Sequence, residues 1–128
     1  TGVIQTKVMI TGSASAANAS LLFAYQADHQ RYRYVKLMPG KILVGQAGLL
    51  GGQAGGIKKT IPVPAVAKKW YTLRADLDSV GNVKVYLDGA LKGTFRFKKA
   101  VAGWIGLGAD RVESVFDNFY CQEATVFP

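Results

Sequence analysis

Apolar and polar residues alternate with a period of two along most of the chain, which is the pattern of half-buried β-strands. The alternation is clearest from Trp70 to Lys98, where three such segments are separated by the turn sequences 79–82 and Asp88-Gly89. Asp-Gly favours a tight hairpin because glycine tolerates the positive φ of the turn. The segment is therefore predicted to form a three-strand meander with one apolar and one polar face. Its apolar face is predicted to carry Tyr71, Leu73, Ala75, Leu77, Val83, Val85, Leu87, Leu91, Phe95 and Phe97.

Seven other segments show strand-like patterns, and no ten-residue window has the spacing of an amphipathic helix. Pro39-Gly40 is a strong turn signal and predicts a hairpin between the third and fourth segments. Pro62 and Pro64 place the fifth at a sheet edge, because proline donates no ladder hydrogen bond. The glycine-rich stretch 48–56 is either a mobile loop or a place where backbone passes close to another group. The predicted segments are 3–10, 20–26, 31–38, 41–46, 57–66, 103–108 and 114–123.

About ten short strands with short turns predict an all-β fold of two packed antiparallel sheets, or a barrel. The sandwich is favoured because the meander has one wet and one dry face. A chain of 128 residues is long enough to bury a core, so residues 1–128 are predicted to form a single domain. Because the sequence starts with Thr1, we expect a processed chain, an excised module or a recombinant fragment.

The composition is basic, with 16 Lys and Arg against eight Asp and Glu and a formal charge of +8. Such a surface favours polyanions such as nucleic acid, anionic lipid or an acidic polysaccharide. The basic residues are scattered in pairs near predicted turns, which a well-solvated surface also explains. No apolar run approaches the roughly 20 residues needed to span a bilayer. The single cysteine, Cys121, is predicted to be a small buried residue; an intermolecular disulfide or a reactive thiol is the alternative.

Four short motifs carry a resemblance to a known superfamily: Trp70-Tyr71-Thr72-Leu73, Val83–Gly89, Gly103–Leu107 and Phe116–Phe119. In this order they resemble the concanavalin A-like lectin/glucanase superfamily, and in particular the laminin-G-like modules and their bacterial relatives. The resemblance implies a jelly-roll sandwich that is extracellular or on the cell surface. It also implies binding of glycans or proteins through rim loops or a concave face, often beside a structural calcium.

The chain departs from this pattern at its start. Such modules begin with additional strands, one of which pairs beside the last strand. Here the chain enters what looks like a later strand almost at Thr1. Either the fold is trimmed, or another chain supplies the missing strand, since an uncovered edge invites strand addition.

The sequence does not favour catalysis. Glycoside hydrolysis needs two carboxylates facing each other across the bond that is cleaved. The two glutamates, Glu113 and Glu123, have no acid two residues away, and Asp76 and Asp78 are expected to be solvated partners of basic neighbours. The lone histidine, His29, has no adjacent nucleophile motif. The chain is predicted not to be an enzyme.

Calcium binding is implied by the resemblance alone. Asp117 matches the position that supports a calcium in some relatives, although its usual partner lies in the absent first segment. Asp28 and Asp110 are possible further ligands if their loops converge.

Sugar binding needs exposed aromatic faces beside polar groups. The aromatic candidates are Tyr25, Tyr32, Tyr34 and Trp104, and the polar candidates are His29, Gln30, Arg31, Arg33 and Arg111. Tyr32, Tyr34 and Lys36 share one strand face, although core packing is an alternative role for the two tyrosines. Arg31-Tyr32-Arg33-Tyr34 could also stack nucleic-acid bases, but no RNA- or DNA-binding motif accompanies it.

The leading hypothesis is a non-catalytic extracellular module that recognises a glycan, in particular an anionic polysaccharide. Its motivation is the lectin-like resemblance, the missing carboxylate pair and the basic surface. The alternative is a structural subunit or adhesin domain of an extracellular assembly, completed by strand exchange with a neighbouring chain. Nucleic acid is a less favoured partner.

Overall fold

The computed structural model describes residues 2–11, 18–110 and 114–123, with side chains as far as residue 108. The described residues form ten strands and no helix, so this part of the chain has no helix that could cross a membrane. The strands are β1 (Gly2–Ile10), β2 (Asn18–Tyr25), β3 (Tyr32–Met38), β4 (Lys41–Ala47), β5 (Gly56–Pro62), β6 (Trp70–Leu77), β7 (Asn82–Leu87), β8 (Ala90–Arg96), β9 (Trp104–Asp110) and β10 (Ser114–Glu123).

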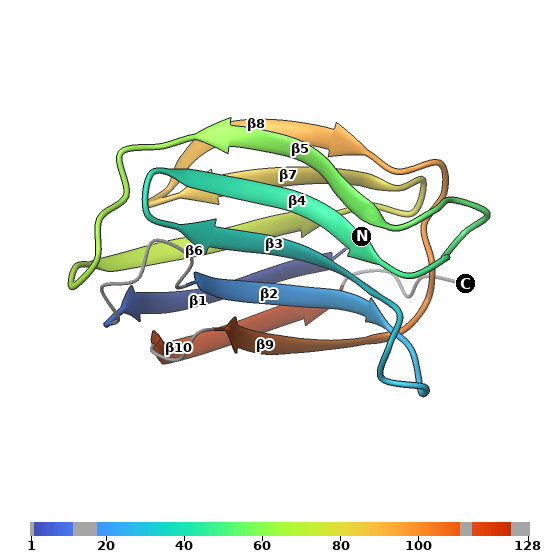
Figure 1. The fold of residues 1–128 in the computed structure, drawn as a ribbon, viewed down its shortest axis with the longest axis horizontal. Helices are drawn as coiled ribbons and strands as arrows, with labels where there is room; N and C mark the ends of the chain where they lie inside the picture. Colours follow the sequence, from blue (N-terminus) through green and yellow to red (C-terminus); the bar gives the residue numbers. More distant parts are fainter. Residues whose placement is uncertain (1, 12–17, 111–113, 124–128) are drawn as a thin grey trace.

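Two five-stranded antiparallel sheets pack face to face, as Figure 1 shows. One has the strand order β10-β1-β6-β7-β8 and is called the β6 sheet here; the other has the order β5-β4-β3-β2-β9 and is called the β3 sheet. Their inner faces supply one core that includes Ile4, Leu21, Val35, Leu73 and Val85. The predicted two-sheet sandwich is thereby confirmed.

The predicted meander is present as β6, β7 and β8, with Ala75 opposite Val85 and Asp76 opposite Lys84. One residue of its predicted apolar face is placed wrongly. Leu91 is 53% exposed, because the β7–β8 register shifts between Val85 and Tyr86 and turns Leu91 outward.

The first strand lies beside the last. β1 pairs with β6 on one side and with β10 on the other, and Ile4 stands opposite Cys121. The described chain itself therefore supplies a neighbour for β10, and this pairing requires no second chain.

The fifth strand is an edge strand, as its prolines predict, and it ends at Pro62. The glycine-rich stretch before it makes close backbone contacts, which is the second of the two alternatives for this segment. A side-chain carbon on Gly55 would lie 2.7 Å from the Gly48 nitrogen. Leu50 and Gln53 pair across a two-residue turn made by Gly51 and Gly52, both with positive φ.

Candidate functional site

Alternate residues of β3 point to opposite sides of the β3 sheet. Arg33, Val35 and Leu37 are buried between the sheets, whereas Tyr32, Tyr34 and Lys36 lie on the outer face. This is the face assignment predicted from the sequence. Neither tyrosine belongs to the core between the sheets, although Tyr34 is 9% exposed and thus buried on the outer face, whereas Tyr32 is partly exposed.

Tyr34 is the best-packed aromatic residue of the outer face. Its ring covers Gly45, the residue opposite it on β4, and the Lys36 ammonium lies 4.8 Å above its ring centre. Burial, together with the neighbouring Tyr32, raises the pKa of the Tyr34 hydroxyl. This hydroxyl is thus a proton donor throughout the neutral range.

A bulge in β2 places Tyr25 beside these residues. The β2–β9 register shifts between Leu22 and Tyr25, and Ala24 adopts a φ of 52°. By strict alternation Tyr25 would share the inner face with Phe23, but the extra residue turns it outward. The Tyr25 and Tyr32 rings stack with centroids 5.4 Å apart and planes inclined by 19°.

His29 extends the aromatic row into the β2–β3 turn. Its ring centroid lies 5.7 Å from that of Tyr25, and its backbone has a φ of 59°. The turn is closed by the Asp28 carboxylate, which accepts hydrogen bonds from the Gln30 and Arg31 backbone nitrogens and from Arg31 Nε. The Gln30 N–H and then the Arg31 guanidinium lower the pKa of Asp28. This carboxylate therefore stays ionised and is committed to the turn.

Trp104 stands at the start of β9, directly opposite Tyr25, with 61% of its surface exposed. Gly103 allows the backbone before β9 to pass close to β2, since a side-chain carbon at this position would lie 2.5 Å from the Ala24 carbonyl carbon. Predicted residues from three strands and a turn therefore gather at one end of the outer face: Tyr25, His29, Tyr32, Tyr34 and Trp104.

A groove of about 220 Å³ continues from this row along the outer face. Gly106 and Gly108 stand on β9 opposite Leu22 and Ser20, and a side-chain carbon on Gly106 would meet nothing within 4 Å. Gly108 lines the groove and leaves its floor flat beside Tyr32 and Tyr34, and Gly106 continues the same face of β9 next to it. The groove is lined by Asn18, Ser20, Leu22, Tyr32, Tyr34, Lys36 and Gly108.

The sequence reading did not identify Asn18, Ser20 or the two β9 glycines as site residues. The period of two in β2 was the available signal for Ser20, since it puts Ser20 on the opposite strand face from Ala19 and Leu21, although all three residues are buried. Nothing local indicated that β9 would pair beside β2.

Other predicted residues do not join this site. Gln30 and Arg31 belong to the turn at its end, and Arg111 lies outside the described residues.

Asp117 stands opposite Lys7 in the backbone pairing of β10, with its side chain outside the described part. Asp110 pairs with Asn18 at the start of β2, whereas Asp28 follows the end of β2, so these two acids lie at opposite ends of the sheet. Among the residues that are described, no group of three His, Cys, Asp or Glu could hold a metal.

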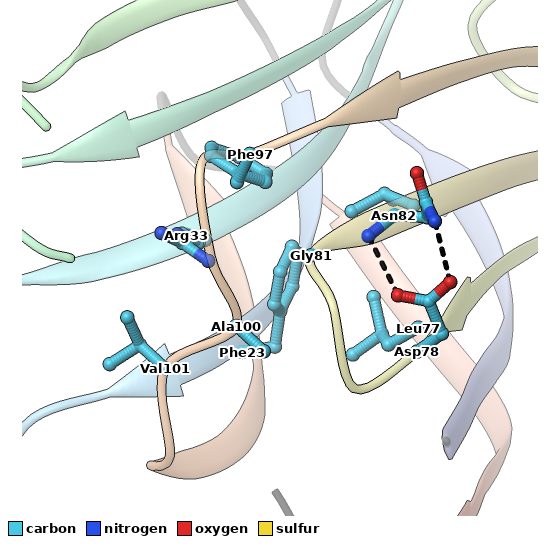
Figure 2. A pocket seen from close by; sticks show the side chains of 10 residues that line it. Phe23, Arg33, Leu77, Asp78, Gly81, Asn82, Phe97, Ala100 and Val101 are labelled. Atoms are coloured by element: carbon cyan, nitrogen blue, oxygen red, sulfur yellow. Dashed lines mark hydrogen bonds between the residues drawn. The ribbon is translucent and has the colours of Figure 1, made fainter.

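Arg33 lies between the two sheets and not on the outer face of the β3 sheet. Its Nε donates to Gln46 Oε1 at 3.0 Å, its Nη1 donates to the Lys99 carbonyl at 2.7 Å, and its guanidinium lies 4.1 Å from the Phe97 ring centre. Figure 2 shows it between Phe97 and Val101 at the wall of a small interior pocket. Burial lowers its pKa to about 10, so it is charged at neutral pH.

No protein-family model matches this chain, and no curated protein matches it. Solved structures do match. The carbohydrate-binding module CBM66 from Bacillus subtilis superposes with a TM-score of 0.75 at 17% identity, covering 95% of this chain and 74% of that one. The galectin LEC-6 from Caenorhabditis elegans gives 0.70 at 11% identity, with 95% and 82% covered. A β-glucanase from Bacillus licheniformis gives 0.64 at 13% identity, with 94% and 64% covered.

The chain has the concanavalin A-like lectin/glucanase fold. A binding module, a galectin and a glucanase share this fold, so the fold alone does not assign an activity.

In this concanavalin A-like sandwich Asp76 pairs with a basic neighbour, as predicted, whereas Asp78 binds turn residues that carry no charge. Arg74 holds Asp76 through two hydrogen bonds, of 2.6 and 2.9 Å. Asp78 accepts hydrogen bonds from Val80 N, Asn82 N and Asn82 Nδ2, and so caps the β6–β7 turn. Burial opposes ionisation of Asp78, but these hydrogen bonds outweigh it and hold its pKa below the usual value. Both acids act within the β6 sheet and its turn, away from the outer face of the β3 sheet.

Proposed function

We propose that this protein is a non-catalytic module that binds a polysaccharide on the outer face of the β3 sheet. The observation that carries the proposal is the row of Tyr25, Tyr32 and Tyr34 with exposed Trp104 at one end, beside a polar, flat-floored groove. Sugar rings offer apolar faces that pack on aromatic rings and hydroxyls that pair with polar side chains. Similarity in fold to a carbohydrate-binding module and to galectins supports the same function.

The preferred ligand is an anionic polysaccharide. Lys36 is the charged residue among those lining the groove, and the net charge of the chain is +8. A basic surface raises the local concentration of polyanions and speeds their association. Binding to such a polymer fits a module that works outside the cell or at its surface.

The proposal is tested by electrophoresis through gels that contain polygalacturonate, alginate or heparin at low salt, with neutral xylan and dextran alongside. Retardation by an acidic polymer is expected, and no retardation by any of the five would reject the function. Trp104→Ala should weaken binding by at least about tenfold, because large aromatic side chains, tryptophan above all, often supply much of the binding energy at an interface. Trp70→Ala is the matched control, since Trp70 is 44% exposed on the β6 sheet.

A structural role is the second candidate, and a separate observation favours it. β9 and β10 each end a sheet and so present an edge to other chains. A subunit or adhesin domain joined by strand exchange would associate through such an edge. Light scattering across a wide concentration range tests this role, and a strictly monomeric protein would reject it.

A structural calcium at Asp117 is proposed as a separate feature, on the resemblance alone. If it is present, chelation with EDTA should lower the melting temperature, and added calcium should restore it. Asp117→Asn should remove this response. An unchanged melting temperature after exhaustive chelation would exclude the ion.

A further inference from the structure

A second groove, of about 480 Å³, opens at the rim of the sandwich, beside the aromatic end of the outer face. Three loops form it, and Gln26 ties two of them together: its Nε2 donates to the Ala24 carbonyl at 2.9 Å and to the Ala102 carbonyl at 2.8 Å. The loop thus held leads directly into Trp104. The lining is Gln26, Arg31, the 49–52 turn and the segment 99–102.

The charged residues lining this groove are both cationic. Lys99 has no ion pair with a carboxylate of the described residues, and Arg31 uses Nε for Asp28 at 2.6 Å, which leaves its two terminal nitrogens for other acceptors. Asp28 itself is absent from the lining. The groove therefore offers cationic donors without an acidic side chain among its lining residues.

The glycine turn adds backbone donors. Gln46 Nε2 donates to the carbonyls of Gly48 and Gln53 at 2.9 and 2.7 Å, which draws loop oxygens toward the core. The Leu50 and Gln53 N–H groups bond each other's carbonyls, whereas no described residue accepts a hydrogen bond from the N–H of Gly51 or Gly52. Free N–H groups beside cations are a recurrent arrangement for holding oxyanions.

A buried positive charge lies behind the same turn. Arg33 is 2% exposed, and its Nη2 is buried with no hydrogen-bond partner. That nitrogen lies 3.0 Å from where a side-chain carbon on Gly51 would stand, so the turn separates it from the groove by one glycine. A buried cation without a carboxylate costs free energy, and an anion across the thin glycine wall would offset that cost.

We infer that the rim groove between Arg31, Lys99 and the Gly51-Gly52 turn binds an oxyanion, namely the carboxylate or sulfate group of an acidic saccharide. This inference rests on the proposed function, which supplies the acidic saccharide. The link between the two sites is that the groove adjoins Trp104 and the outer-face aromatic residues. A saccharide unit beyond Trp104 would place its acidic group over the rim. The groove then selects acidic over neutral polymers, and the outer face holds the sugar rings.

The test is an NMR titration of the ¹⁵N-labelled protein with sodium glucuronate, sodium sulfate and methyl glucoside at constant ionic strength. Saturable shifts of the Gly51 and Gly52 amides are expected with glucuronate, with sulfate or with both, and none with the neutral sugar. The first two arms distinguish a carboxylate site from a sulfate site. Equal responses to all three additives, or no saturable shift with either anion, would overturn the inference.

Two matched pairs of variants make the test specific. Lys99→Gln should raise the concentration for half-saturation about tenfold, because it removes a charged hydrogen bond, whereas Lys98→Gln, at the adjacent exposed lysine outside the lining, should leave it unchanged. Gly52 has a φ of 73° with nothing within 4 Å of its side-chain position, and Asn and Asp tolerate that backbone. Gly52→Asp should abolish the Gly51 shift, and Gly52→Asn should retain it. Identical behaviour within both pairs would reject the site.

Failure of the inference and failure of the proposed function give different results. If acidic polymers retard the protein but the glycine amides do not respond, the outer face binds glycans without a rim site. If the amides respond and no polysaccharide is retained, the anion site stands and the proposed function fails.

Discussion

The ring of Tyr34 on β3 lies against Gly45, its direct partner on β4, so that the glycine has no space for a side chain. An added carbon there would overlap the Tyr34 hydroxyl and stand 2.8 Å from the Gly56 carbonyl oxygen. Gly45 thereby lets an aromatic residue lie flat on the outer face, next to the Tyr25–Tyr32 stack.

Gly45→Ala is predicted to destabilise the protein by about 1–3 kcal/mol, because the extra carbon must push Tyr34 or the β5 backbone away. Urea denaturation measures the loss. Gly106→Ala is the control, since its side-chain position is open and its φ is ordinary; it should be neutral or stabilise by up to about 1 kcal/mol. Equal stabilities for the two variants would contradict the packing described here.

A larger side chain on the outer face of β9, next to the groove, should hinder ligand binding without harming the fold. Gly106→Val places a branched side chain in the open space beside Leu22, and valine is favoured in strands. Polysaccharide affinity is expected to fall by at least about tenfold while the melting temperature holds. Thr94→Val makes a β-branched change at an exposed position on β8 of the other sheet and should bind normally. If Gly106→Val binds the polysaccharide with undiminished affinity, the glycan does not bind in this groove.

The bulge that turns Tyr25 outward depends on the positive φ of Ala24. Ala24→Val is predicted to cost about 2 kcal/mol or more, because a branched residue resists the left-handed conformation. Ala24→Gly, which accepts that conformation, should keep both the fold and the binding. Tyrosine NMR signals measure how much of the valine variant is folded. If its binding falls by more than its folded fraction, the bulge orients Tyr25. Equal binding by both variants would show that it does not.

Protonation of the Asp78 carboxylate in the β6–β7 turn should lower the free energy of unfolding at acidic pH. Its pKa is lowered on folding, so its ionised form stabilises the folded state above about pH 4, and this contribution is lost as the pH falls below the unfolded value. Asp78→Asn should lose about 1–2 kcal/mol at pH 7 and show a shallower decline below pH 4. Asp76→Asn, which removes a half-exposed ion pair with Arg74, should change stability by less than about 1 kcal/mol. Urea midpoints from pH 7 to pH 2 decide between these outcomes.

Much of the architecture was predictable from local pattern. The period of two separated Tyr32, Tyr34 and Lys36 from Arg33 and Val35, because side chains of an extended strand must alternate between its faces. Turn chemistry at Pro39-Gly40 and Asp88-Gly89 located two hairpins, and Pro62 marked an edge strand. Each of these features depends on neighbouring residues alone.

The places where sequence reasoning failed are those where strands meet. Leu91 follows the apolar alternation, yet a register shift against β7 turns it to solvent. Tyr25 reaches the outer face only through the bulge at Ala24. Period-two reasoning assumes unbroken pairing, and a single extra residue inverts the faces that follow it.

The sequence by itself thus determined an all-β sandwich and the strand face that Tyr32, Tyr34 and Lys36 share. Tertiary structure alone decided that β9 lies beside β2, which sets Gly106 and Gly108 next to Leu22 and Ser20 as an open floor. It also placed Arg33 behind Gly51, with Lys99 and Arg31 at the same rim. Strand faces follow from the geometry of a single extended chain, whereas these sites arise from pairing and packing between segments far apart in the sequence.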